Sequence, residues 1–307
     1  MTAKPENRVI MIVGPTAVGK TGASILLARE LGTEIISADS MQIYRHMDIC
    51  TEKPSAEELG AVRHHMIDIV EPSEDFSAGR YLDMAGPIME GLLSEGRIPL
   101  VAGGTGLYVR AMTRGLFDGP GADWELRHEL LGLGNEELLG RLAALDPEAA
   151  SSIEPGNTRR LVRALEVCIR SGRPISELRR EGTSPLPYDF IKLALTRERE
   201  ELYRMIEERV DRMLERGLIE EVRRVMGMGP GLTPGQAIGY KEVAAYIEGE
   251  YSLEEAVRLI KRNTRRYAKR QMTWFRAEPG LRWVDITGSR EPEEAHERIR
   301  GELGGLL

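Results

Sequence analysis

The chain has few cysteines, few aromatic residues and no long apolar run, and these shortages exclude several classes of protein. Only two of its 307 residues are cysteine, Cys50 and Cys168. They have neither the spacing of a metal site nor the density of a disulfide scaffold. No apolar stretch approaches the roughly 20 residues that span a membrane, so we expect no membrane contact. The first residues lead straight into a predicted strand. We therefore expect no signal peptide and a cytoplasmic location, with both thiols free.

The chain has no excess of positive charge, since its net charge is −7. One segment is nevertheless strongly basic, because it carries many cations and no acid lies between Ala256 and Ala277. Like charges on one helical face repel unless an anion lies beside them, so this segment favours contact with a nucleic-acid backbone. The alternative is a solvated surface helix that buries Trp274 and Phe275. Tyr267 and these two aromatic residues interleave with the cations Arg258, Lys261, Arg262, Arg265, Arg266, Lys269, Arg270 and Arg276.

The strongest motif follows the apolar run Val9–Val13 and matches the phosphate-loop pattern G-x-x-x-x-G-K-[ST]. Its glycines let backbone N–H groups point at an anion, Lys20 adds a positive charge, and the Thr21 hydroxyl suits Mg²⁺. The alternative is an ordinary turn between a strand and a helix. The expected phosphate-binding residues are Gly14, Pro15, Thr16, Ala17, Val18, Gly19, Lys20 and Thr21.

Two later strands of the predicted sheet end in contrasting residues. Asp39 follows one strand, at the edge where open α/β sheets bind ligands. It is suited to ordering Mg²⁺ or to accepting a proton, and the alternative is a helix cap by Asp39 or Ser40. The fourth strand ends in Gly103-Gly104-Thr105, where phosphate-loop NTPases usually carry an acid for Mg²⁺. This missing acid weakens an ATPase interpretation, although these glycines also suit a tight packing turn.

Strand-like and helical patterns alternate, which predicts an α/β fold: a P-loop NTPase-like parallel sheet core with a mostly helical insertion domain. The expected strands are Val9–Val13, Glu34–Ser37, His65–Ile69, Leu100–Ala102, Ile191–Leu195 and Arg282–Ile286. The expected core helices are Thr21–Leu31, Gly79–Glu95, Glu200–Arg216, Leu218–Met226, Tyr240–Glu248 and Leu253–Arg276. Between about Leu116 and Phe190 we expect no strand, only helices, at Asp123–Leu131, Glu136–Leu145 and Thr158–Ser171. The predicted division is core 1–115, helical insertion 116–190 and core 191–307.

Several motifs occur together and in order along nearly the whole chain. They are Gly14–Thr21, Asp39-Ser40-Met41-Gln42-Ile43-Tyr44-Arg45, Met47-Asp48-Ile49 with Lys53-Pro54, Gly103-Gly104-Thr105-Gly106-Leu107-Tyr108, Gly239-Tyr240-Lys241 and Lys269-Arg270-Gln271-Met272-Thr273-Trp274-Phe275-Arg276. This set resembles the bacterial tRNA dimethylallyltransferases, which prenylate the adenosine just 3′ of certain anticodons. Met41-Gln42 departs from the residues that often follow Asp-Ser in the family. Arg159 stands where a tRNA-contact motif usually begins with Gln.

The resemblance implies a prenyl transfer in which the phosphate loop binds the pyrophosphate of dimethylallyl diphosphate and not ATP. Asp39 would take the proton of the adenine N6 amine, and Lys20 with Mg²⁺ on Thr21 would stabilise the leaving group. Thr105 would lie beside the entering adenine, and Arg209 would reach the same phosphates.

The resemblance also implies a tRNA anticodon stem-loop as partner, with the helical insertion clamping its stem and the protein acting as a monomer. Competing interpretations are a nucleoside- or shikimate-type kinase, a nucleotide-gated RNA-binding switch without catalysis, and prenylation of free adenine nucleotides. The expected tRNA-binding residues are Asp39, Ser40, Met41, Gln42, Thr105, Arg159, Arg160, Arg163, Gly239, Tyr240, Lys241, Lys269, Arg270, Gln271, Trp274 and Arg276.

Overall fold

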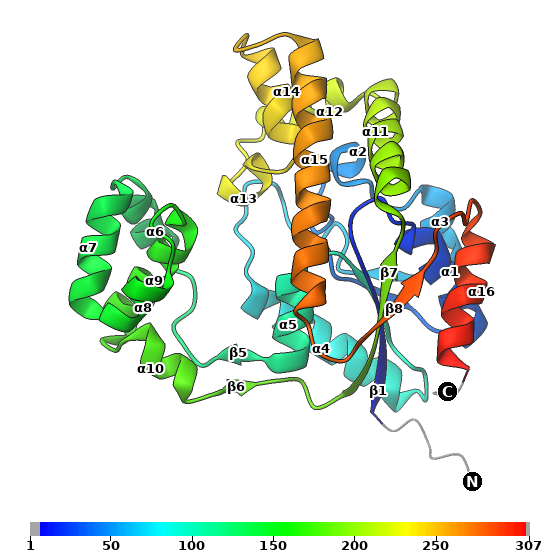
Figure 1. Ribbon diagram of the computed structural model, residues 1–307, viewed down its shortest axis with the longest axis horizontal. Helices are drawn as coiled ribbons and strands as arrows, with labels where there is room; N and C mark the ends of the chain where they lie inside the picture. Colours follow the sequence, from blue (N-terminus) through cyan, green and yellow to red (C-terminus); the bar gives the residue numbers. More distant parts are fainter. Residues whose placement is uncertain (1–6, 305–307) are drawn as a thin grey trace. The chain divides into compact units, whose positions relative to one another are not determined.

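The computed structural model describes residues 7–304, and they divide into two compact units (Figure 1). One unit is a core formed by the chain up to Arg110 and from Pro187 onward, and the other is Ala111–Leu186. The insertion boundaries expected from the sequence were 116 and 190. Among the described residues, no helix is long and apolar enough to cross a lipid bilayer.

The core unit is built on a six-stranded sheet in which every neighbouring pair of strands is parallel. The strand order is β3-β2-β4-β1-β7-β8. The strands are β1 (Arg8–Val13), β2 (Ile35–Ser37), β3 (His64–His65), β4 (Leu100–Gly103), β7 (Asp189–Thr196) and β8 (Leu281–Asp285). Val9–Val13 of the central β1 are completely buried, as expected for a parallel strand covered on both faces. Val13 pairs with Gly103 of β4 and Ser37 of β2 with Ala102, so the loops that follow these three strands meet at one edge.

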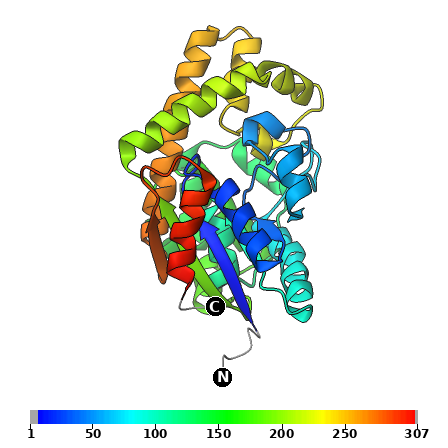
Figure 2. The same ribbon diagram turned by 90° about the vertical axis from the view of Figure 1, so that its right-hand side faces the viewer.

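Eleven helices of the core unit surround this sheet in the described part of the chain. They are α1 (Lys20–Leu31), α2 (Asp48–Thr51), α3 (Ala56–Ala61), α4 (Ala78–Ser94), α5 (Gly106–Arg114), α11 (Arg199–Glu215), α12 (Leu218–Met226), α13 (Leu232–Gly235), α14 (Tyr240–Ile247), α15 (Leu253–Arg276) and α16 (Pro292–Leu303), of which α5 runs across the boundary between the units. Helices α1 and α16 lie side by side (Figures 1 and 2). Leu27 of α1 and Ile299 of α16 join Ile10 and Ile12 of β1 in one apolar cluster. Helices α11 and α15 also pack against each other. The C-terminal helix α16 therefore completes the apolar core that α1 forms with β1.

The second unit has its own apolar core. Its helices are α6 (Trp124–Leu131), α7 (Asn135–Leu145), α8 (Pro147–Ser152), α9 (Thr158–Ser171) and α10 (Ile175–Arg180). Leu138 and Leu142 of α7 pack with Leu161 and Leu165 of α9. Two short antiparallel strands, β5 (Leu116–Phe117) and β6 (Thr183–Ser184), join the two ends of the unit.

A buried carboxylate organises this second unit. Glu166 is completely buried, and its Oε1 accepts hydrogen bonds from the Asp123 backbone N–H at 2.6 Å and from Arg127 Nε at 2.9 Å. Arg163 also donates to Glu166 and reaches the Pro120 carbonyl. Burial opposes ionisation of Glu166, but the bonds from Arg127 and Arg163 prevail and lower its pKa. The carboxylate therefore ties α6 to α9.

The expected α/β core is confirmed, and two expectations about strands are wrong. The strand expected at His65–Ile69 is only His64–His65, because Met66 and Asp68 adopt left-handed backbone conformations, with φ of 63° and 55°, that a strand does not accommodate. The insertion is not free of strands, since β5 pairs with β6. The sequence interpretation also missed the short helices α2, α3, α5, α8, α10 and α13, and the C-terminal α16.

We expect Glu166→Ala to lower the free energy of unfolding by about 3 kcal/mol, because it leaves two partly buried guanidinium groups without their anion. Because the folded pKa of Glu166 is lowered, its stabilisation is present above the unfolded pKa and is lost as pH falls through the folded value. Urea unfolding at pH 7 and at pH 3.5 measures both effects. Glu137→Ala is the control, since its pair with Arg141 is exposed and such pairs contribute under about 1 kcal/mol. Equal losses in the two variants would refute the assignment.

Candidate functional site

The phosphate loop connects the carboxyl end of β1 to the N-terminus of α1. Gly14 has φ of 148°, and a Cβ at this position would lie 2.8 Å from the Leu195 carbonyl oxygen, so no other residue fits there without displacing β7. Gly19 caps α1 in a left-handed conformation, and the helix begins at Lys20. The first N–H groups of α1 consequently face the end of the sheet, where they favour an anion.

Lys20 lies folded over its own loop. Its Nζ donates to the carbonyl oxygens of Gly14 at 3.0 Å and Pro15 at 2.7 Å. Burial lowers the pKa of Lys20 to about 8; the charge of Asp39 opposes this shift and that of Arg209 adds to it. Lys20 is therefore a cation whose charge depends on pH close to neutrality.

Three long side chains from distant parts of the chain hold the loop. Gln271 of α15 is buried, accepts the Thr16 N–H on Oε1 at 2.9 Å and donates from Nε2 to the Gly104 carbonyl at 2.8 Å. Arg197 donates from Nε to the Val18 carbonyl at 2.8 Å. Arg209 of α11 donates to the Thr16 hydroxyl at 2.7 Å. The loop is thus braced on its backbone by two of these residues and on a side chain by the third.

Asp39 stands at the end of β2 and shapes the turn that follows it. Its Oδ1 accepts the Met41 N–H at 2.8 Å and lies 3.4 Å from the Gln42 N–H. The Thr105 hydroxyl accepts the Ser40 N–H at 2.9 Å. No helix begins at Asp39 or Ser40, so the helix-cap alternative is wrong, although Asp39 does cap a turn. These bonds hold the turn after Asp39 together and join it to Thr105.

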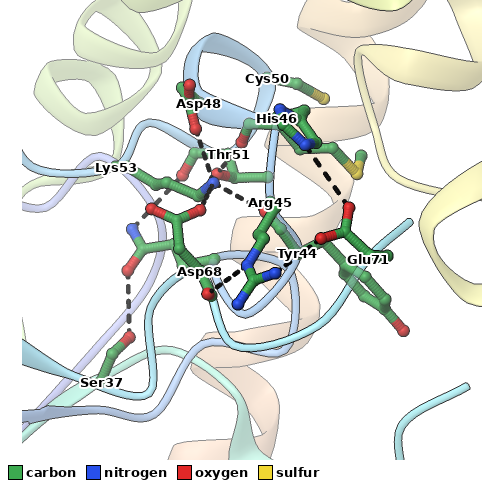
Figure 3. A network of polar contacts seen from close by, with 12 residues as sticks. Ser37, Tyr44, Arg45, His46, Asp48, Cys50, Thr51, Lys53, Asp68 and Glu71 are labelled. Carbon is green, nitrogen blue, oxygen red and sulfur yellow. Dashed lines mark hydrogen bonds and ion pairs between the residues drawn. The ribbon is translucent and has the colours of Figure 1, made fainter. Parts of the chain in front are cut away.

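The segment beyond this turn is held by the buried amine of Lys53 (Figure 3). Lys53 Nζ donates to the Tyr44 carbonyl at 2.7 Å, to Asp48 Oδ1 at 2.6 Å and to Asp68 Oδ1 at 2.5 Å. Beside this network, Glu221 of α12 accepts three backbone N–H groups at the start of α2, those of Asp48, Ile49 and Cys50. Lys53 therefore holds the two ends of the segment 44–53 together, and Glu221 holds the backbone N–H groups in its middle.

These elements enclose a cavity of about 250 Å³ in the core unit. Among its lining side chains, the cations are Lys20, Arg209 and Arg212, and the acids are Asp39 and Glu52. His64, Tyr267, Gln271, Gln42 and residues of the phosphate loop also line it. One part of the cavity thus suits a polyphosphate anion, while Asp39 supplies a carboxylate beside it.

The cavity contains many of the residues expected from the sequence, but not all of them. Thr16, Ala17, Gly19, Lys20, Thr21, Asp39, Gln42, Arg209 and Gln271 line it. Thr105 does not line it, but follows the lining residue Gly104 and accepts the N–H of Ser40, the neighbour of Asp39. Glu52, His64, Met205, Arg212 and Tyr267 also line the cavity but were not predicted. Two of them carried a local signal. Glu52 precedes Lys53-Pro54 of one motif, and Tyr267 is one of the aromatic residues among the cations of the basic segment. His64, Met205 and Arg212 come from a strand and a helix that only the fold brings to this edge.

The lack of acids within α15 does not mean that its cations lack acidic partners. Arg258 pairs with Glu255, Lys261 with Asp211 at 2.6 Å, and Arg265 with Glu207. The last two acids belong to α11, so the sequence argument from missing acids is wrong for Lys261 and Arg265. Among the described residues, no ion pair involves the exposed side chains of Arg266, Lys269, Arg270 and Arg276.

The remaining expected tRNA-binding residues lie outside the cavity lining. Tyr240 is buried, and the Gly239 N–H donates to Glu242 at 2.8 Å. Lys241 is partly exposed, and Arg159 and Arg160 are exposed on the first turn of α9. Arg163 is engaged with Glu166 inside the insertion. Trp274 covers Gly106, whose missing side chain leaves room for the indole ring.

The protein offers few side chains that could bind a metal ion at this cavity. Within residues 7–304, no group of three or more His, Cys, Asp or Glu side chains could hold a metal ion. Thr21 presents a hydroxyl at the start of α1 and lines the cavity. This donor set fits a magnesium ion that arrives with a polyphosphate ligand, since Mg²⁺ is often bound through one or two protein groups plus phosphate oxygens and water.

Comparisons with known proteins agree on one family. The model of the IPP transferase family matches residues 42–278, and that of the isopentenyl transferases matches residues 7–74. A tRNA dimethylallyltransferase of Thermodesulfovibrio yellowstonii is 49% identical over 98% of this chain and 99% of its own. The tRNA dimethylallyltransferase of Pelotomaculum thermopropionicum is 47% identical, with the same coverage.

Solved structures of the same kind share the fold. The tRNA isopentenylpyrophosphate transferase of Bacillus halodurans superimposes with a TM-score of 0.71 at 44% identity, covering 97% of both chains. A eukaryotic dimethylallyltransferase described as acting on tRNA gives a TM-score of 0.82 at 29% identity, covering 96% of this chain and 78% of the other.

We expect the affinity of the cavity for inorganic pyrophosphate to fall roughly tenfold between pH 7 and pH 9, because Lys20 loses its charge as pH rises through about 8. Calorimetric titration at several pH values measures this. Lys20→Arg is the control, since arginine stays charged over this range and reports the titration of the ligand alone. Identical pH profiles for the two proteins would show that Lys20 does not contribute its charge to the binding of the anion.

Proposed function

Because the chain belongs to the IPP transferase family, together with the tRNA dimethylallyltransferases that match it, we propose that it prenylates tRNA. The reaction transfers a dimethylallyl group from dimethylallyl diphosphate to N6 of the adenosine 3′-adjacent to the anticodon and releases pyrophosphate. The observation that carries this proposal is a single cavity in which the phosphate loop and Arg209 face the carboxylate of Asp39.

The phosphate loop is the proposed site of the donor's diphosphate. Lys20, Arg209 and the N–H groups at the start of α1 supply positive charge where the leaving group gains negative charge. The hydroxyl of Thr21, together with the diphosphate oxygens, would hold Mg²⁺, which neutralises part of that charge when bound. Pyrophosphate is a poor leaving group unless its charge is offset in this way.

Asp39 is the proposed general base. An adenine N6 amine is a weak nucleophile because its lone pair is delocalised into the ring. As the N6–C1 bond forms and the C1–oxygen bond of the donor breaks, the amine must lose a proton. The turn bonds at Oδ1 leave Oδ2 without a hydrogen bond among the described residues, which suits this oxygen to receive the proton. Thr105, bonded to Ser40, would lie beside the entering adenine.

The tRNA is proposed to meet the exposed cations outside the cavity. Arg266, Lys269, Arg270 and Arg276 lie exposed on α15, and Arg159 and Arg160 lie exposed on the insertion. We propose that the first group meets the anticodon loop and that the insertion clamps the anticodon stem. The target adenosine must leave its stack to reach the cavity, at a cost of a few kcal/mol that is smallest in single-stranded loops. The protein is proposed to act as a monomer in the cytoplasm.

We expect labelled dimethylallyl diphosphate to transfer its label to unmodified bulk tRNA in the presence of the wild-type protein, with little turnover of ATP. Asp39→Asn should lower the single-turnover rate roughly 10²–10⁴-fold, the usual contribution of a general base, and leave tRNA affinity nearly unchanged. Asp83→Asn is the control, since Asp83 is exposed on α4. Phosphate transfer from ATP without prenyl transfer would instead support the kinase alternative. Near-normal rates in Asp39→Asn would remove Asp39 from the role of base.

We expect replacement of Arg266, Lys269 and Arg270 by Gln to weaken tRNA binding and flatten its salt dependence. Each phosphate contact contributes roughly 0.7–0.9 to the slope of log affinity against log salt concentration. Tri-substitution of Arg258, Lys261 and Arg265 is the matched control, because acids of the protein already neutralise these cations. The measurement is tRNA binding at four salt concentrations, and equal slopes in the two triple variants would contradict the assignment.

A further inference from the structure

One acid in the cavity has no role in the transfer described above. Glu52 follows α2 and points its carboxylate at Arg209, with Oε2 lying 2.6 Å from Arg209 Nε. We propose that Glu52 competes with the diphosphate group for Arg209 and thereby weakens the hold of the site on pyrophosphate. This inference rests on the proposed function, and it makes Glu52 a residue that acts through Arg209 and not on the reacting atoms.

The guanidinium group of Arg209 has two partners, Thr16 of the phosphate loop and Glu52. One end donates to the Thr16 hydroxyl at 2.7 Å, while Nε faces Glu52. The side chain of Arg209 is only 15% exposed and that of Glu52 is 28% exposed, so little water screens the pair. Charge-assisted bonds of this kind are stronger than neutral ones. A diphosphate that reaches Arg209 must therefore share it with a carboxylate already bound there.

Several contacts hold the backbone of Glu52 beside the cavity. Glu52 has φ of 52°, a left-handed conformation that residues other than glycine seldom adopt. Its N–H donates to the Ile49 carbonyl at 3.1 Å, and its carbonyl accepts from Gln42 Nε2 at 3.2 Å. The next residue is the buried Lys53 with its three acceptors. Residues that surrounding contacts hold in this backbone region are common at functional sites, and these contacts hold the backbone of Glu52 beside the cavity that its side chain lines.

The charges lining the cavity show what this carboxylate does. Lys20 and Arg209 attract a diphosphate, while Asp39 is needed close to the amine that loses its proton. Glu52 adds a second negative charge on the side of the cations. A site that binds the transition state must still release pyrophosphate after each reaction, and a competing anion at Arg209 favours that release. Removing its charge should tighten pyrophosphate binding roughly tenfold.

The test is calorimetric titration of the full-length protein with inorganic pyrophosphate at a fixed magnesium concentration. Glu52→Gln keeps an oxygen acceptor for Arg209 Nε and removes the charge, and Glu52→Ala removes both. We expect both variants to bind pyrophosphate about tenfold more tightly than the wild type. Glu57→Gln removes an equal charge from an exposed position five residues on and should leave affinity unchanged. A tighter complex is not a result that loss of structure produces, and circular dichroism checks that each variant is folded.

A double-mutant comparison separates competition for Arg209 from a general charge effect. In an Arg209→Gln background, the gain from Glu52→Gln should vanish, because the cavity no longer has a guanidinium that Glu52 occupies. The other cationic partner of Glu52, Arg216 at 4.0 Å, does not line the cavity. Unchanged or weaker binding in Glu52→Gln, or a gain that persists without Arg209, would overturn the inference while leaving the donor site intact. A wild-type protein that binds no pyrophosphate would instead overturn the proposed donor site, and the inference with it.

Discussion

The site depends on one buried carboxamide. Gln271 accepts the Thr16 N–H and donates to the Gly104 carbonyl, so it joins the loop after β1 to the loop after β4 from a helix 255 residues further along the chain. An apolar side chain of the same size would leave both backbone groups buried without partners, which is costly. This carboxamide also lines the cavity. Helix α15 therefore does more than carry surface cations, since its position determines the geometry of the phosphate loop. Arg197, which directly follows β7, and Arg209 of α11 complete the support.

The parts of the site that sequence reasoning found are those with a local physical signature. A fully apolar run before Gly14–Thr21 predicts a central strand followed by a phosphate loop, and β1 is buried as that pattern requires. Asp39 was found because acids at the carboxyl ends of parallel strands meet at one edge, and the register of β2 and β4 places it there. The boundaries of α12 and α15 match the expected ones, since amphipathic periodicity extends along the whole of each helix.

What the sequence could not reveal depends on contacts between distant residues. The acids that pair with Lys261 and Arg265 belong to α11, and nothing within α15 indicates them. The two hydrogen bonds of Gln271, to Thr16 and Gly104, likewise cannot be predicted from the sequence around any of these residues. The strand expected at His65–Ile69 fails because Asp68 is turned into a left-handed conformation where it pairs with Lys53, a tertiary contact that prevails over local strand preference. Glu52 lies between the two parts of one motif, Met47-Asp48-Ile49 and Lys53-Pro54, but its partner Arg209 lies on the distant helix α11.

The short pairing of β5 with β6 has a consequence for how such a protein can change over generations. Leu116 and Ser184 are directly opposite each other, so the insertion begins and ends at neighbouring points, as a long hairpin does. Antiparallel partners lie about 5 Å apart. The chain therefore leaves the core and returns to it at nearly the same point, whatever the length of the insertion between β5 and β6. An insertion joined in this way can lengthen, shrink or be exchanged for another without altering the order of the six parallel strands. The cavity of the core unit and the insertion can therefore accumulate substitutions as separate modules.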